Sequence, residues 1–214
     1  MRLKHVKGAE EYIAGSDQVV QDYKEHKGAW NEFFGNSNRI HIEIGMGKGQ
    51  FLMEMAATHP DINYIGIERY SSVLIRAVQK KEEMDLINLT FILMDATEIC
   101  EVFDEQEVDR IYLNFSDPWP KDRHSMRRLT SSRYLNIYKQ ILKKDGCIEF
   151  KTDNRGLFDY SLESASTAGW SVSEVTYDLH GSEYADKNVM TEYEEKFSAE
   201  GNPIMRAVFE QLNF

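Results

Sequence analysis

The sequence has few cysteines and no long apolar run. Two cysteines, Cys100 and Cys147, are too few for a disulfide framework, and neither has the spacing of a zinc-binding motif. No apolar run reaches the length of a transmembrane helix, and the first residues, MRLKHVKGAEEY, lack the apolar segment of a secretory signal. The six histidines are scattered along the chain, so no metal site is predicted. These absences favour a cytoplasmic protein with an ordinary apolar core.

The length and charge of the chain set further limits. A chain of 214 residues with 42% hydrophobic residues suits a single domain over residues 1–214, in which residues 1–35 can form a flexible N-terminal arm. The net charge of −11 argues against nonspecific binding to nucleic acid. However, eight Lys or Arg residues accompany a single acid between Lys121 and Lys144. This window predicts a local surface that can bind phosphate, although a solvated helix face would have a similar composition.

The pattern of apolar residues predicts an α/β fold. Apolar runs rich in β-branched residues alternate with segments of helical period, and the short connections favour a doubly wound, mostly parallel sheet. The expected strands are 39–44, 63–67, 89–93, 108–115, 147–151, 171–177 and 204–211, which makes seven. The expected helices are 50–59, 71–84, 131–142 and 156–167. We expect the last strand to be antiparallel.

A glycine-rich turn, E-I-G-M-G-K-G over residues 43–49, follows the first expected strand. Glycines at such a turn let the backbone approach a ligand at a helix N-terminus. The dinucleotide fingerprint G-x-G-x-x-G does not fit because position 50 is Gln, and Glu43 would repel a pyrophosphate. A carboxylate attracts the ammonium group of S-adenosylmethionine (SAM), so the turn favours SAM over a dinucleotide.

Three further acids follow later strands. Glu68 lies nineteen residues after Gly49, where α/β nucleotide sites place an acid that binds ribose hydroxyls, and Asp95 follows the third strand. Asp117 begins the stiff turn Asp-Pro-Trp-Pro after the fourth strand. Each acid alone is typical of a helix cap, but ligands bind where parallel strands end. The bases that follow the turn can donate to phosphate oxygens: Lys121, Arg123, Arg127 and Arg128.

At these residues the chain resembles the bacterial SAM-dependent tRNA (guanine-N7-)-methyltransferases, a class I methyltransferase family. The resemblance spans essentially the whole chain. It includes E-I-G-M-G-K-G (43–49), G-I-E-R (66–69), N-F-S-D-P-W-P-K (114–121), R-H-x-x-R-R (123–128), F-K-T-D-N (150–154) and T-E-Y-E (191–194). One departure is Met126, where the family commonly has a basic residue.

The resemblance implies a Rossmann-like class I methyltransferase fold and methyl transfer from SAM to N7 of the variable-loop guanosine, position 46, of tRNA. The product of the cofactor is S-adenosylhomocysteine. The implied cofactor-binding residues are Glu43, Gly45, Gly47, Gly49, Glu68, Asp95 and Asp117, with Asp117 also the catalytic residue. The implied tRNA-binding residues are Lys121, Arg123, Arg127, Arg128, Asp153, Thr191, Tyr193 and Glu194. No metal or membrane partner is expected, and the chain can be a monomer or a homodimer.

The chemistry of guanine N7 fits this reading. N7 has a lone pair and loses no proton when it is methylated, so Asp117 is expected to orient the base and stabilise charge. The base has to leave its tertiary contacts, and Trp119 or Tyr193 could stack on it. Two alternatives stay open: an adenine amino-group methyltransferase with a related Asp-Pro-Pro-aromatic turn, and a noncatalytic RNA-binding protein. A nicotinamide oxidoreductase fits less well because of the glycine spacing.

Overall fold

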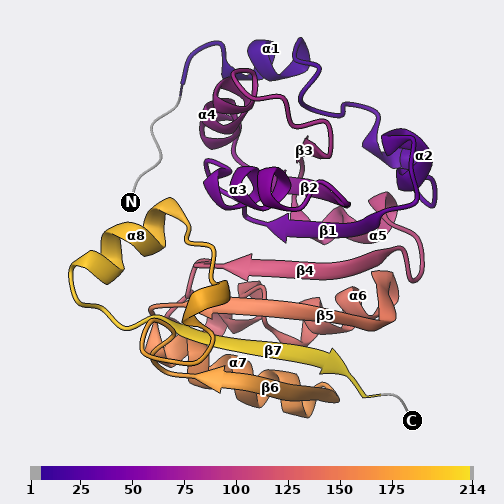
Figure 1. Ribbon diagram of the computed structural model, residues 1–214. Helices are drawn as coiled ribbons and strands as arrows, with labels where there is room; N and C mark the ends of the chain where they lie inside the picture. The colour runs from indigo at the N-terminus through magenta and orange to yellow at the C-terminus, as the bar shows by residue number, and fades with distance from the viewer. Residues whose placement is uncertain (1–5, 213–214) are drawn as a thin grey trace. The chain divides into compact units, whose positions relative to one another are not determined.

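The computed structural model of the chain describes residues 6–212 (Figure 1). Its strands are β1 (Arg39–Ile44), β2 (Ile62–Glu68), β3 (Leu89–Leu93), β4 (Val108–Asn114), β5 (Leu142–Thr152), β6 (Trp170–Thr176) and β7 (Met205–Gln211). Within the described residues they form a seven-stranded sheet in the order β3-β2-β1-β4-β5-β7-β6. The chain divides into two compact units, Met1–Asp104 and Glu105–Phe214. The single domain over residues 1–214 stays a prediction.

The first unit contains three parallel strands. Strand β1 pairs with β2, and β2 pairs with β3. Every residue of β1 after Arg39 and of β2 after Ile62 is buried. Parallel strands that are covered on both faces are buried along their whole length and rich in apolar residues, which is why their positions were predictable. The helices of this unit are α1 (Ala9–Ala14), η1 (Tyr23–His26), α2 (Trp30–Phe34), α3 (Gln50–Thr58), α4 (Ser71–Lys81), η2 (Ala96–Glu98) and α5 (Ile99–Val102).

Gly66, in the middle of β2, fixes the packing of the glycine-rich turn against the sheet. A Cβ atom at this position would overlap Met46 Sδ and lie 2.9 Å from both Leu52 Cδ1 and Phe91 Cδ1. Met46 belongs to the turn between β1 and α3 and is 6% exposed. The absence of a side chain at Gly66 therefore lets this turn lie directly on β2.

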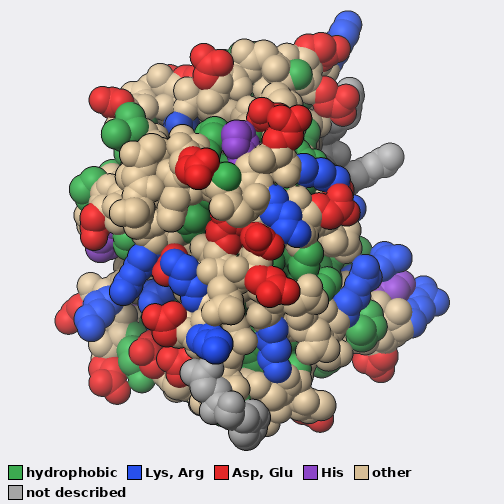
Figure 2. All heavy atoms as spheres, turned by 90° about the vertical axis from the view of Figure 1, so that its right-hand side faces the viewer, with side chains coloured by type: hydrophobic (Ala, Val, Ile, Leu, Met, Phe, Trp, Pro, Cys, Tyr) green, Lys and Arg blue, Asp and Glu red, His purple; other side chains and the backbone are tan. Residues whose placement is uncertain are grey.

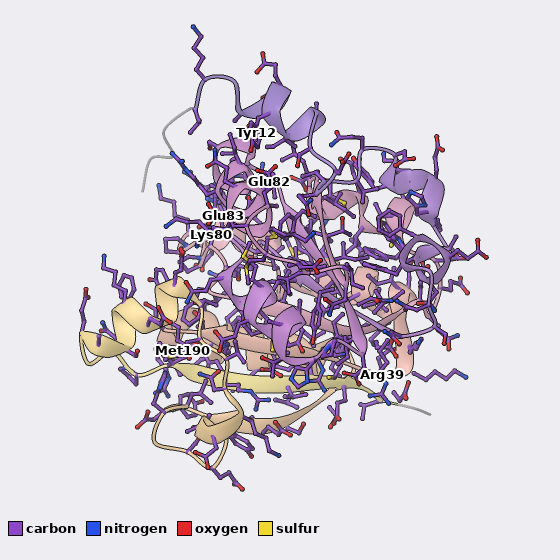
Figure 3. The ribbon with its side chains drawn as sticks, turned by 45° about the horizontal axis from the view of Figure 1, so that its top comes forward. Tyr12, Arg39, Lys80, Glu82, Glu83 and Met190 are labelled. Atoms are coloured by element: carbon purple, nitrogen blue, oxygen red, sulfur yellow. The ribbon has the colours of Figure 1, made fainter. Side chains whose placement is uncertain are left out.

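The N-terminal segment packs on the outside of the first unit. Tyr12 Oη, in α1, donates a hydrogen bond to Glu82 Oε2 at 2.5 Å, just beyond the end of α4 (Figure 3). Ser16 Oγ donates to the second oxygen of the same carboxylate at 3.2 Å. Val19 then forms a parallel β-bridge with Phe91 and covers the outer edge of β3. The segment thus ties α4 to the edge of the sheet.

This packing differs from the flexible arm expected over residues 1–35. Ile13 and Trp30 are almost fully buried, and Trp30 Nε1 donates to Val102 O at 2.9 Å. The helices concerned have only six and five residues, too few for a clear helical period in the sequence. Residues 1–5 lie outside the described residues, and for them alone the flexible arm stays a prediction.

The second unit contains the other four strands. Strand β5 pairs parallel with β4 and antiparallel with β7, and β6 also pairs antiparallel with β7, so the predicted antiparallel last strand is confirmed. Three buried phenylalanine rings pack together in the core of this unit. The ring centroid of Phe150, in β5, lies 6.0 Å from those of Phe158 and Phe209. The helices of this unit are η3 (Asp122–Arg127), α6 (Ser132–Ile141), α7 (Arg155–Thr167), η4 (Ala185–Lys187) and α8 (Glu192–Ala199).

Candidate active site

The glycine-rich turn between β1 and α3 has positive φ values at its three glycines. Gly45, Gly47 and Gly49 have φ values of 78°, 61° and 76°, a region that residues with a side chain rarely adopt. A Cβ atom at Gly45 or Gly47 would meet no other atom within 4 Å, whereas at Gly49 it would lie 3.1 Å from Ala77 Cβ in α4. The first two glycines therefore serve the backbone conformation, and the third also permits close packing of α3 on α4.

Glu68 connects this turn to the end of β2. Its side chain is buried, and its Oε2 accepts a hydrogen bond from Gly47 N at 3.2 Å. Its Oε1 accepts from Arg69 N at 2.8 Å and Tyr70 N at 3.0 Å. Burial raises the pKa of the Glu68 carboxyl, and these backbone N–H groups and the Arg69 charge oppose the shift. A carboxylate has about four acceptor sites, so one remains for a ligand hydroxyl.

Glu43 and Asp95 stand beside Glu68 at the neighbouring strands. Glu43 is 2% exposed in β1 and pairs in register with Gly66 of β2, two residues before Glu68. Asp95 follows β3, accepts hydrogen bonds from Thr97 N and Thr97 Oγ1 at 3.0 and 2.8 Å, and lies 3.5 Å from Arg69 Nη2. The structure thus brings three predicted acids and the glycine turn together in the first unit. Arg69, which joins Glu68 and Asp95, was not identified from the sequence.

The Asp117 turn belongs to the second unit and leaves the end of β4. Its backbone is strained: Phe115 and Trp119 have φ values of 51° and 41°, uncommon for bulky residues. Phe115 N donates to Lys151 O at 2.9 Å and keeps the start of the turn beside β5. Asp117 itself is exposed, so its carboxylate can meet a ligand.

Three of the predicted phosphate-binding residues are exposed on or beside η3. Lys121, Arg123 and Arg127 all have solvent-exposed side chains. The Arg127 guanidinium carbon lies 5.0 Å from the centre of the Trp119 ring, a cation–π contact. Figure 2 shows that Lys and Arg side chains gather in places among acidic ones, despite the net negative charge. The exposed positions of Lys121, Arg123 and Arg127 suit contacts with phosphate groups.

Arg128 differs from its neighbour Arg127. It is 8% exposed, its Nε donates to Pro118 O at 3.0 Å, and its Nη2 donates to Trp119 O at 3.1 Å. Its guanidinium carbon also lies 4.1 Å from the centre of the Tyr160 ring in α7. This placement does not favour the predicted phosphate contact at Arg128, because the side chain is enclosed by the protein. The sequence of two adjacent arginines does not indicate which of them is buried.

Asp153 and Tyr193 form a second polar group in this unit. Tyr193 Oη donates to Asp153 Oδ2 at 3.1 Å, across forty residues of sequence. Burial, together with the charge and hydrogen bond of Asp153, raises the pKa of Tyr193 to about 12. The Tyr193 ring stacks on Phe197 at 4.0 Å and lies 5.0 Å from Phe115, the residue at the end of β4. An aromatic surface beside a carboxylate can bind a base by its face and its polar edge.

Thr191 and Glu194 form the start of α8. Thr191 is the N-cap, and its Oγ1 accepts a hydrogen bond from Glu194 N at 3.0 Å. Glu194 is fully buried and accepts from Lys151 Nζ at 2.7 Å and from Asn188 Nδ2 at 2.6 Å, while His180 Nε2 lies 3.2 Å from its Oε1. The Glu194 carboxylate is therefore bound by other side chains of the protein. The matching Lys151, in F-K-T-D-N, was not identified from the sequence.

The described residues contain neither a metal-binding cluster nor a membrane-spanning helix. From Val6 to Leu212, no three His, Cys, Asp or Glu side chains are grouped so that they could bind a metal ion. Over the same residues, every helix is too short or too polar to cross a bilayer.

Comparison with known proteins gives the family. Residues 37–207 match the model of a family described as "Putative methyltransferase". The chain is 61% identical over 208 residues to the tRNA (guanine-N(7)-)-methyltransferase of Lachnoclostridium phytofermentans, with 97% of each chain covered. It is 51% identical over 211 residues to the protein of the same name from Bacillus subtilis, with 98% of this chain and 99% of the relative covered.

Solved structures agree with the fold. An antibiotic-related methyltransferase has a TM-score of 0.61 at 20% identity, over 85% of this chain and 92% of that chain. The 16S rRNA methyltransferase KamB has a TM-score of 0.64 at 10% identity, over 86% and 94%. At such identities the likeness concerns the fold alone, and it confirms the predicted class I methyltransferase architecture. On the strength of its near-full-length relatives, the chain belongs to the tRNA (guanine-N(7)-)-methyltransferase family.

Proposed function

We propose that this protein transfers a methyl group from SAM to N7 of a guanosine in tRNA, at position 46 of the variable loop. The observation that supports this most directly is 61% identity over 97% of both chains to a tRNA (guanine-N(7)-)-methyltransferase. The reaction class also suits the residues present, because methylation of N7 needs an oriented base and charge stabilisation more than a strong general base.

The acids of the first unit fit SAM. Glu68 has acceptor capacity for a ribose hydroxyl, and its bond to Gly47 N fixes it beside the glycine turn. Asp95 can accept from the adenine amino group, and the Glu43 carboxylate attracts the ammonium group of the methionine part. When bound, the cofactor supplies the electrophilic methyl group. The turn 45–49 precedes α3, whose N-terminus provides backbone N–H groups.

Residues of the second unit suit the nucleic acid. Asp117 is exposed on a stiff turn, where its carboxylate can accept hydrogen bonds from the guanine N1–H and amino group and stabilise the positive charge that methylation leaves on the base. Asp153 and Tyr193 offer a second carboxylate and an aromatic face. Lys121, Arg123 and Arg127 can contact phosphates, which positions the tRNA without reading its bases.

The test is methylation of an unmodified tRNA transcript with labelled SAM, followed by nuclease mapping and nucleoside analysis. We expect N7-methylguanosine at position 46, and no label in a matched transcript in which adenosine replaces that guanosine. Label in an adenine amino group would instead support the alternative methyltransferase. A protein that binds tRNA but neither methylates it nor binds S-adenosylhomocysteine would be the noncatalytic alternative.

A further inference from the structure

The neighbours Arg127 and Arg128 have the same chemistry and different surroundings. Arg127 is exposed and lies over the Trp119 ring, whereas Arg128 is 8% exposed. Both were expected to bind phosphate because they belong to the same basic run. Arg128 uses two of its five N–H groups on carbonyl oxygens, and its burial leaves the other three little access to a phosphate.

The two Arg128 hydrogen bonds lie on either side of Trp119. Pro118 O, the acceptor for Nε at 3.0 Å, belongs to the peptide that precedes Trp119, and Trp119 O, the acceptor for Nη2 at 3.1 Å, belongs to the peptide that follows it. A single rigid guanidinium therefore fixes both peptide planes around this residue. Those planes define the φ of 41° that Trp119 adopts against its own preference.

The two prolines limit how the backbone of this turn can hold its own shape. Pro118 and Pro120 have no backbone N–H, so they cannot donate the hydrogen bonds that usually close a turn. Residues 115–120 have no helix or strand structure between β4 and η3. The Arg128 side chain supplies donors that hold these carbonyl groups, and with them the preceding Asp117, in one orientation.

Arg128 is itself held from two directions. Its guanidinium lies on the ring of Tyr160 in α7, with 4.1 Å between the guanidinium carbon and the ring centre. Its backbone N donates to Ser125 O at 3.0 Å, and its carbonyl accepts from Ser131 N at 2.9 Å. Helix α7 is anchored in the core by buried Phe158. A continuous set of contacts thus links the core of the second unit to the turn that presents Asp117.

We propose that Arg128 is a positioning residue: it fixes the Asp117 turn through the carbonyl groups of Pro118 and Trp119 and does not bind tRNA phosphate. The proposal rests on the proposed function, in which Asp117 acts on the guanine. The three exposed bases, Lys121, Arg123 and Arg127, then account for phosphate binding on this segment. Of the two arginines of the R-R pair, Arg128 thereby positions the Asp117 turn and Arg127 contacts the substrate.

The test compares Arg128→Lys with Arg127→Ala by steady-state methylation of tRNA at several salt concentrations. Lysine keeps the charge but cannot donate to two carbonyls and stack at once. We expect Arg128→Lys to lower kcat about 100-fold, as misplacement of a catalytic group does, with unchanged KM for tRNA and unchanged salt dependence. Arg127→Ala should instead raise the KM and reduce the slope of log affinity against log salt by about 1.

Arg128→Lys with a raised KM and a reduced salt slope would overturn the proposal. Should that variant not fold, Tyr160→Leu takes its place, since it keeps both hydrogen bonds and removes only the supporting ring. It is expected to lower kcat at constant KM, and a change confined to KM would contradict the positioning role.

A readout that needs no turnover separates this proposal from the proposed function. The chain has three tryptophans, so fluorotryptophan labelling gives few lines, and Trp119→Phe identifies the line of Trp119. We expect one narrow line in the wild type and in Arg127→Ala, and a broad or split line in Arg128→Lys. An unchanged line would refute the positioning role, whereas a wild type that makes no N7-methylguanosine would refute only the function.

Discussion

Lys151 Nζ lies 2.7 Å from Glu194 Oε2, and both side chains are completely buried. Lys151 also donates to Asn188 Oδ1 at 3.0 Å and to Val189 O at 2.8 Å. One lysine at the end of β5 thus joins the segment before α8 to the first turn of that helix. Since Thr191 and Tyr193 lie between Asn188 and Glu194, the ion pair helps to determine where two of the predicted tRNA-binding residues stand.

Loss of the lysine should therefore be costly. Lys151→Met leaves Glu194 buried without its cation, and breaking such a pair costs about 3–5 kcal/mol of unfolding free energy, measured by urea denaturation. The matched control is Lys143→Met in the same strand, whose partner Asp109 lies 2.9 Å away at a partly exposed site. We expect a loss below about 1 kcal/mol there. Equal losses in the two variants would contradict an internal role for Lys151.

The glycine at position 66 gives a second stability prediction. Gly66→Ala forces Met46 away from β2, and overpacking of this kind costs about 1–3 kcal/mol. Because Met46 belongs to the glycine-rich turn, affinity for S-adenosylhomocysteine should fall as well. The control is Gly156→Ala in α7, where the nearest atom would lie 3.5 Å from the new Cβ, and stability should stay the same or rise.

Restoration provides the check on this mechanism. Met46→Ala in the Gly66→Ala background removes the atom that overlaps and should recover part of the lost stability. If the double variant were less stable than the wild type by the sum of the losses measured for Gly66→Ala and Met46→Ala singly, the overlap would not be the cause.

Some of these features were predictable from the sequence because they are local. β1 and β3 have the bounds expected, since isoleucine recurs along β1, and leucine, isoleucine and phenylalanine make up most of β3. The acids after the strands were predictable from topology, because parallel strands end at one edge. The first half of β5 was not expected, since Lys143, Lys144 and Asp145 give it no apolar pattern.

Other features depend on partners far away in the sequence. Helix α8 buries only Glu194 among its residues, so it has no apolar period that would reveal it. Glu194 is buried because of Lys151, forty-three residues earlier. The difference between Arg127 and Arg128 depends on Tyr160 in another helix. The sequence gives the residue types of a site, but burial decides which of them stay available to a ligand.

Glu68 should make cofactor binding depend on pH. Burial raises the pKa of its carboxyl, so in the free protein it takes up a proton at a higher pH than an exposed glutamate does. A protonated carboxyl is a poorer acceptor for a ribose hydroxyl. We expect affinity for S-adenosylhomocysteine, measured by calorimetry, to fall as the pH is lowered from 7 toward about 5. Glu68→Gln should bind more weakly and lose most of this dependence.

The sign is opposite for folding. A raised carboxyl pKa in the folded chain means that the Glu68 contribution to stability is largest below the ordinary glutamate pKa. It is lost as the pH rises through that value to the raised one. Glu68→Gln should therefore gain stability relative to the wild type at neutral pH. No gain there would show that the backbone hydrogen bonds outweigh the cost of burial.

Tyr193 should keep its proton far into the alkaline range. Its pKa is raised to about 12 by burial and by the charge and hydrogen bond of Asp153. In NMR of tyrosine labelled at the phenol carbon, one resonance should titrate near that value, and Tyr193→Phe identifies it. Asp153→Asn removes the charge, so the midpoint should move toward the ordinary tyrosine value of about 10. An unmoved midpoint would leave burial and the charge of Glu200 as the causes of the raised pKa.

Asp117 gives the sharpest test of the chemistry. Asp117→Ala removes a carboxylate from an exposed turn whose shape depends on Pro118, Trp119 and Arg128, so the fold should persist. Loss of one oriented group that stabilises developing charge lowers kcat by about 100- to 1000-fold. Affinity for S-adenosylhomocysteine, which the proposed function assigns mainly to acids of the first unit, should change little. The measurements are single-turnover methylation and calorimetric titration on the same preparation.

The isosteric variant separates the two parts of this role. Asp117→Asn keeps the size and one acceptor oxygen but removes the negative charge, so activity between those of the wild type and Asp117→Ala would show that hydrogen bonding contributes independently of charge. The matched control is Asp122→Ala, an exposed acid five residues later that is not assigned to the reaction. Because both changes remove one negative charge near the same basic residues, a general effect on tRNA attraction would alter both variants alike. Full turnover in Asp117→Ala would therefore exclude Asp117 from catalysis.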